Sequence, residues 1–236
     1  MSDSIVVDIE TKINKALIAF VIFEGQNISP EDAYTQYQQQ LIEKSGSDFM
    51  PIIFHEPLII GYAHVNTKYE IKKVGTLPEG NEGVIKFWEA VNKGYRVVSW
   101  NGRCFDLPVL ELAALRLGLQ MPDYYNQKFG ARYRFSEDGH YDLYDFITNS
   151  GAVYYRGGLQ AVSQMIGLPG KTGSVRGHEV QAAYEAGRMD EIAHYCIGDV
   201  LLTCGIYFHI ENMRGRLNRE EYEHRIQDVK ERIHVR

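Results

Sequence analysis

The fold is constrained most by one stretch near the middle of the chain, Val97 to Pro108. Its first residues are β-branched and apolar, which is typical of a buried strand, and Asn101-Gly102 is a turn signal. Pro108 is favoured at the start of a helix, because it has no amide hydrogen to leave unpaired there. The stretch therefore predicts a strand, a loop and a helix, with Asp106 at the mouth of the loop, where helix capping alone would explain an acid.

Length and composition indicate one α/β domain over residues 1–236. The chain has 236 residues, 44% of them hydrophobic, which is enough for one sizeable core, and no Pro/Ser-rich linker divides it. Its three cysteines are an odd number without a C-x-x-C pair. This count favours neither a disulfide framework nor a thiolate zinc site, and it indicates a reducing compartment.

The ends and the charge of the chain exclude some classes of protein. Residues 1–4 lack the basic start of a secretory signal, and the apolar run 16–23 is shorter than the roughly 20 residues of a membrane span. We therefore expect a soluble, cytoplasmic protein without membrane partners. The net charge of −6 argues against coating of duplex nucleic acid. It is compatible with an enzyme whose bound divalent metals supply positive charge locally.

Hydrophobic periodicity predicts a mixture of strands and helices along the whole chain. Strands are expected at 4–11, 58–65, 69–74, 95–100 and 140–145. Helices are expected at 14–24, 30–44, 81–93, 107–117, 158–167, 178–186, 189–213 and 218–235, with Ser29 as an N-cap and Gly118 as a C-cap.

Two acids stand near the end of the first predicted strand. Asp8 and Glu10 are two residues apart, so both side chains lie on one face of the strand and Ile9 points to the other. The pair can form part of a metal or catalytic site. Taken alone, the pair is better explained as a solvated strand end, because a chain with 31 acids contains such pairs by chance.

The long helix 189–213 carries a second candidate pair. Tyr195 and Asp199 are four residues apart and therefore share one helix face, as a site or as a structural contact. His194 precedes Asp199 by five residues, a step that rotates the side chain by about 140° around the helix. This rotation favours Tyr195 over His194 as the partner of Asp199.

Two further segments have both a functional and a structural interpretation, and a third can be compared with a phosphate-binding motif. Residues 128–135 interleave cations and rings, which suits single-stranded nucleic acid but also an ordered surface loop. Arg214, Arg216 and Arg219 indicate either a strand-guiding patch or a solvated helix end. Residues 168–173 lack the spacing of a phosphate-binding loop.

Three motifs in order along the chain carry a resemblance to a known family. They are Asp-x-Glu-Thr at 8–11, Asn-Gly-x-x-Phe-Asp-Leu-Pro at 101–108 and Tyr-x-x-x-Asp at 195–199. Together they resemble the exonuclease motifs of the DEDD 3'-5' exonuclease superfamily. More closely, the chain is similar to bacterial proteins related to the proofreading domain of family-B DNA polymerases. The likeness also includes 46–49, 98–102, 140–145, 168–171 and 213–217.

The resemblance implies a ribonuclease-H-like fold, a mixed sheet of about five strands flanked by helices. It implies that two Mg²⁺ or Mn²⁺ ions stabilise the attacking and leaving oxygens of a displacement at phosphorus. The expected ligands of these ions are Asp8, Glu10, Asp106 and Asp199. Tyr195, of the superfamily's tyrosine branch, completes the catalytic set by orienting water. The expected nucleic-acid contacts are Thr11, Asn101 and Phe105.

The leading hypothesis is a metal-dependent exonuclease that digests single-stranded 3' ends to nucleoside monophosphates, with DNA favoured over RNA. One alternative is a catalytically silent ribonuclease-H-like module that binds nucleic acid or protein. Another is an RNA-processing exonuclease with the same site. The matched acids in all three motifs favour an enzyme, because a binding module has no need to gather four carboxylates near phosphate.

Overall fold

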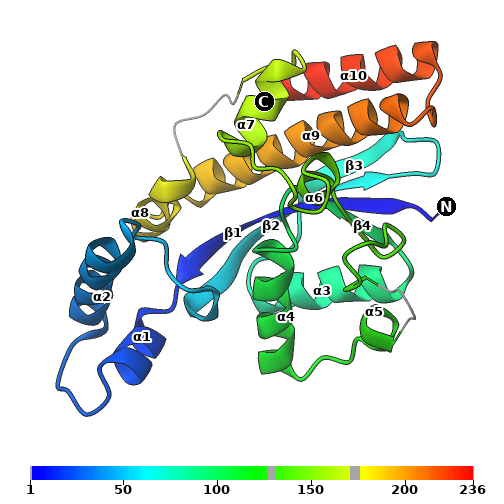
Figure 1. Cartoon of the computed structure of the whole chain (residues 1–236). Coiled ribbons are helices and arrows are strands. Elements are labelled where there is room, and N and C mark those ends of the chain that lie inside the picture. The colour runs from blue at the N-terminus through cyan, green and yellow to red at the C-terminus, as the bar shows by residue number, and fades with distance from the viewer. Residues whose placement is uncertain (1, 127–130, 171–175, 236) are drawn as a thin grey trace.

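The computed structural model describes residues 2–126, 131–170 and 176–235, which form a five-stranded mixed sheet with helices on both faces (Figure 1). The strand order is β3-β2-β1-β4-β5. β1 pairs antiparallel with β2 and parallel with β4. At the two edges, β3 pairs antiparallel with β2, and β5 pairs parallel with β4. The strand bounds are β1 (Ser4–Ile13), β2 (His55–Val65), β3 (Ile71–Thr76), β4 (Arg96–Ser99) and β5 (His140–Asp142).

The helices form two layers and one separate hairpin (Figure 1). One face of the sheet is covered by α7 (Gly158–Met165), α8 (Val180–Glu185), α9 (Met189–Met213) and α10 (Arg219–His234). The other is covered by α3 (Asn81–Asn92), α4 (Asp106–Leu117) and α5 (Pro122–Asn126). The hairpin consists of α1 (Lys15–Ile22) and α2 (Pro30–Ser45), and α6 (Leu143–Ile147) follows β5. Short 3-10 turns lie at Ile52–Phe54 and Gly177–Glu179.

Alternation along β1 builds a hydrophobic core on each face of the sheet. Val6 packs in the cluster with Leu201 of α9, whereas Ile5 and Val7 pack in the cluster with Leu110 of α4. This arrangement confirms the expected α/β fold with a mixed five-stranded sheet. In the described part of the chain, no helix is long and apolar enough to cross a membrane.

Helix ends follow the local capping signals in most places. The Ser29 side chain accepts from the Asp32 amide at 3.1 Å, and Gly118 ends α4 in the left-handed region at φ 66°. The predicted strand 140–145 is wrong beyond Asp142. The Asp142 side chain accepts from the amides of Tyr144 and Asp145 and so starts a helix there. Residues 171–173 of the connection discussed above lie outside the described residues.

The close approach of α9 to the sheet depends on Gly61 of β2. Gly61 pairs with Asp8 of β1. A Cβ at this position would lie 2.7 Å from the Cys196 Sγ and 3.1 Å from the Val200 Cγ2, closer than side chains pack. The Cys196 thiol lies 3.3 Å from the Asp8 carbonyl oxygen, to which it donates. Gly61 therefore allows the middle of α9 to lie directly on the strand pair that carries Asp8.

We predict that Gly61→Ala destabilises the protein by about 1–3 kcal/mol, because α9 must move away from β2 to admit the methyl group. Chemical denaturation of the variant measures the loss. Gly75→Ala on β3 is the matched control, because its Cβ would meet only Tyr62, at 3.9 Å. Adding Cys196→Ala to Gly61→Ala should recover part of the loss. Equal unfolding midpoints for the two glycine variants would contradict the packing argument.

Candidate active site

The first two acids of the site lie on the face of β1 that α9 covers. Ile9, between them, is buried in the core on the opposite face. Carboxylate oxygens of Asp8 and Glu10 and the Sγ of Cys196 all lie within 4.8 Å of one another. Sequence reasoning did not single out Cys196, which carries no motif signal of its own and enters the site through the packing of α9 on Gly61.

Asp106 reaches the same place from the opposite layer. It is the first residue of α4, and its Oδ1 accepts a hydrogen bond of 3.1 Å from the Ile9 amide. Asp106 is 6% exposed. Burial, followed by the charges of Asp142 and Asp199, raises its pKa to about 7, although backbone hydrogen bonds act in the other direction. The capping explanation of this acid is therefore wrong, because Phe105 holds the N-cap position and Asp106 binds β1.

Tyr195 and Asp199 complete the cluster from α9, which runs without interruption through both residues. Burial raises the pKa of the Tyr195 hydroxyl above its usual range, and the charges of Asp199, Glu10 and Asp8 raise it further. The hydroxyl thus faces the acids of β1 as well as Asp199. His194 is exposed, and its Nδ1 lies 2.7 Å from the Asp190 carbonyl oxygen one turn earlier. The structure therefore brings together Tyr195, and not His194, with the acids.

The loop before Asp106 is held by Asp142, whose role sequence reasoning missed. The Asp142 Oδ1 accepts from the Asn101 amide and Oδ2 from the Arg103 amide, both at 2.9 Å. Oδ1 also accepts from the amides of Tyr144 and Asp145 at 3.0 and 3.3 Å. Asn101 has a φ of 57°, a conformation that asparagine adopts more readily than most residues. One buried carboxylate therefore fixes both the loop and the start of α6.

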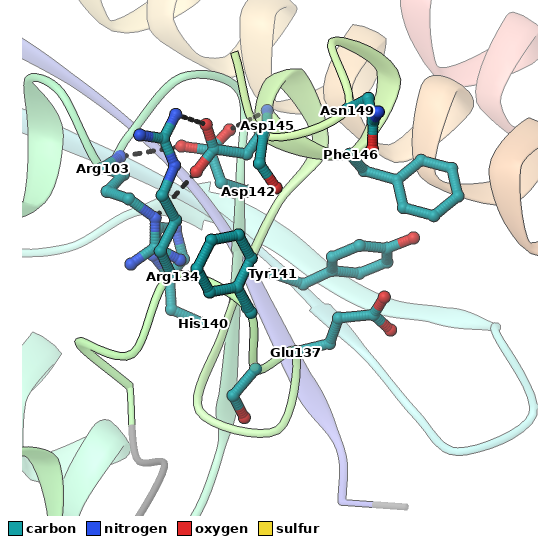
Figure 2. A pocket seen from close by; sticks show the side chains of 12 residues that line it. Arg103, Arg134, Glu137, His140, Tyr141, Asp142, Asp145, Phe146 and Asn149 are labelled. Carbon is teal, nitrogen blue, oxygen red and sulfur yellow. Dashed lines mark hydrogen bonds and ion pairs between the residues drawn. The ribbon is translucent and has the colours of Figure 1, made fainter. Parts of the chain in front are cut away.

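Next to this loop lies a cavity of about 210 Å³ in which two arginines bind one acid (Figure 2). Arg103 Nε and Arg134 Nη2 donate to the two oxygens of Asp145 at 2.9 and 2.7 Å. Arg132, from the same basic segment as Arg134, forms an ion pair with Glu111 at 3.4 Å. Arg132 and Arg134, which belong to the segment 128–135 considered for binding single-stranded nucleic acid, thus pair with carboxylates of the protein itself. Residues 128–130 of that segment lie outside the described residues.

The basic residues after α9 have structural partners too. Arg214 and Arg216 donate to Glu211, which is fully buried, at 3.3 and 2.9 Å, and Arg214 also donates to Glu137 at 2.7 Å. Arg219 forms an ion pair with Glu223 on the surface of α10. These contacts favour the structural interpretation of this segment. Arg214 and Arg216 bind a buried acid and so anchor the end of α9, whereas Arg219 lies on a solvated helix surface.

An aromatic cluster borders the acids on the side of the α1–α2 hairpin. The Phe105 ring lies 5.0 Å from the His55 ring and 5.7 Å from the Phe49 ring, centroid to centroid. His55 Nε2 lies 3.0 Å from the Met50 carbonyl oxygen, so it carries the proton, and Nδ1 accepts from the Thr11 hydroxyl at 2.7 Å. Thr11 and Phe105 are thus joined through His55, whereas Asn101 is positioned separately by Asp142.

A family model described as predicted 3'-5' exonucleases related to the exonuclease domain of PolB matches residues 47–236. The chain belongs to this family. The match includes Asp106, Tyr195 and Asp199 but begins after Asp8 and Glu10, which enter the site on the sequence motif and the geometry. Among curated protein sequences, no match to the chain was found.

The solved structure of a DNA polymerase resembles this family member in fold. The family B DNA polymerase of the archaeon Pyrobaculum calidifontis matches with a TM-score of 0.56 and 13% identity, over 90% of this chain and 25% of the polymerase. E. coli Exonuclease I in complex with a dT13 oligonucleotide matches with a TM-score of 0.40 and 10% identity, over 92% of this chain and 42% of that protein. The chain thus spans about a quarter of the polymerase, and the sheet is of the ribonuclease-H-like kind.

We predict that Asp142→Asn lowers the free energy of unfolding by about 1–3 kcal/mol, because an amide nitrogen cannot accept from the backbone amides now bound there. Thermal or chemical denaturation checks this value. Asp138→Asn is the control. Asp138 is exposed, and its backbone amide, which the substitution leaves in place, donates to the Ser136 Oγ. An Asp142→Asn variant as stable as the Asp138→Asn variant would show that the loop does not depend on this carboxylate.

Proposed function

We propose that the protein is a metal-dependent 3'-5' exonuclease that releases nucleoside monophosphates from single-stranded 3' ends, with DNA favoured. The gathering of four carboxylates and one tyrosine from three distant segments carries this proposal. Asp8 and Glu10 come from β1, Asp106 from the start of α4, and Tyr195 and Asp199 from α9. Family membership supports the same reaction class.

The donor set suits divalent metal ions. Glu10 is 9% exposed, and Asp106 and Asp199 are each 6% exposed, so little water screens these charges from one another. Carboxylate oxygens are the donors that Mg²⁺ and Mn²⁺ prefer. Asp8, Glu10, Asp106 and Asp199 would hold two such ions. When bound, they would stabilise negative charge on the attacking and leaving oxygens of the phosphodiester.

The other residues would place the substrate and the water. A phenol with an ordinary pKa of about 10 is protonated at neutral pH, so Tyr195 acts as a hydrogen-bond donor that orients the attacking water rather than as a base. Phe105 would stack on the terminal base, and Thr11 and Asn101 would contact the terminal nucleotide. Asp142 holds Asn101, and His55 contacts Thr11 and Phe105, so these three residues would need little rearrangement to bind the nucleotide.

Two alternatives are separated by one set of assays. Digestion of single-stranded DNA, single-stranded RNA and a duplex with a recessed 3' end is compared in Mg²⁺ and in Mn²⁺. Faster digestion of RNA would favour an RNA-processing exonuclease with the same site. Binding without digestion in either metal would favour a catalytically silent module.

We predict that a chelator, or Asp8→Ala, stops release of mononucleotides from a 3'-labelled oligonucleotide. The loss should exceed the roughly 10- to 100-fold that outer-shell partners of metal ligands contribute. Asp123→Ala is the matched control, because Asp123 is an exposed acid on α5. The rate is measured from the label released with time. Undiminished digestion in chelator would contradict the proposed chemistry.

We predict that Tyr195→Phe lowers the rate at saturating substrate at least about tenfold, because the water loses its hydrogen-bond partner. His194→Ala should leave the rate unchanged, because His194 is exposed and bonded to the backbone of its own helix. Circular dichroism establishes that both variants are folded. The reverse pattern would assign the protein to the histidine branch of the superfamily.

A further inference from the structure

Phe49 presents a large aromatic surface to solvent beside the candidate active site. Phe49 is 60% exposed, yet its ring stacks on His55 with the centroids 5.3 Å apart and the planes 29° apart. The Phe49 amide donates to the Ser47 Oγ at 3.2 Å, and the next residue, Met50, is buried. Because one face of the ring lies on His55, the opposite face is the one that water reaches.

The place of Phe49, rather than its exposure, indicates a function, since single exposed hydrophobic residues are normal on protein surfaces. Phe49 contacts Phe105, which directly precedes Asp106. It also contacts His55, which is bonded to Thr11, the neighbour of Glu10. The Phe49 ring therefore lies close to Asp106 through Phe105, and close to Glu10 through His55 and Thr11.

We propose that Phe49 stacks on a nucleobase at the 3' end of the substrate and extends the surface begun by Phe105. This inference rests on the proposed function. Aromatic rings bind the bases of single strands by stacking, whatever the base, because every base has a π-face. A ring fixed in place by His55 pays less side-chain entropy on binding than a free one. Paired bases stack on their neighbours within the duplex, so this surface favours unpaired ends.

The test compares Phe49→Ala, Phe49→Leu and Phe49→Trp with the wild type on two oligonucleotides. One is an ordinary single strand, and in the other the last two nucleotides at the 3' end are abasic. On the ordinary strand, Phe49→Ala should raise KM at least about fivefold with little change in kcat. Phe49→Trp should preserve KM, and Phe49→Leu should behave like Phe49→Ala. On the abasic strand, the difference between Phe49→Ala and wild type should disappear.

The control for loss of an exposed ring is Tyr154→Ala. Tyr154 is 79% exposed and precedes α7, on a segment that contributes nothing to the site described above. Its KM should equal that of the wild type. Unfolding midpoints of all variants are measured, and the Phe49 variants should unfold like the wild type because most of this residue is already exposed. An equal loss on both oligonucleotides, or full binding by Phe49→Leu, would overturn the stacking role.

Binding in Ca²⁺, followed by the fluorescence anisotropy of a labelled oligonucleotide, separates this inference from the proposed function. If the wild type digests the oligonucleotide and Phe49→Ala digests it with an unchanged KM, the inference alone is wrong. If the wild type binds but does not digest, weaker binding by Phe49→Ala still supports stacking, and equal binding refutes it. If the wild type neither binds nor digests, the proposed function and the inference are both wrong.

Discussion

The hydrogen bond from the Ile9 amide to Asp106 joins the two halves of the candidate site. Ile9 lies between Asp8 and Glu10, so this bond sets the position of α4 relative to the strand that carries both acids. On the other face, α9 reaches the same strand because Gly61 has no side chain to keep Cys196 away. Three segments that are far apart in the sequence therefore meet at one point of β1.

Two buried acids of this protein, Glu211 and Asp106, differ in the charges that surround them. Glu211 is fully buried but accepts from the Tyr69 hydroxyl at 2.6 Å and from Arg214 and Arg216, so protein cations and donors balance its charge. The charges that raise the pKa of Asp106 instead come from other carboxylates, Asp142 and Asp199. Mutual repulsion of this kind favours the protonated acid, and a bound cation would instead stabilise the charged form. This contrast supports the proposal that cations bind beside Asp106 and not beside Glu211.

Sequence periodicity predicted the sheet and α9, because the apolar residues of strands and of a long helix repeat at fixed intervals. It also placed Asp8 beside Glu10 and Tyr195 beside Asp199, since both pairs lie within one element. The wrong end of the strand predicted at 140–145 has a local cause, the cap that Asp142 forms on α6, whereas the other errors and omissions come from contacts between elements. Asp106 matched a local capping rule but binds β1, and the roles of Asp142 and Cys196 exist only after distant segments have packed. No local pattern carries that information.

The segment that carries Phe49 and His55 packs on a different core from the acids, whereas Phe105 packs with α4. Ile18, Ala33 and Phe54 form a small cluster within the α1–α2 hairpin and the turn before β2, which are the segments that lead to Phe49 and His55. The acids depend on the packing of α4 and α9 on the sheet. The family match begins at residue 47, after the hairpin. We therefore expect a change in the hairpin to move Phe49 and His55 while leaving the arrangement of the carboxylates intact. Under the proposed function, such a change would affect how the 3' end of the substrate is held and not the chemical step.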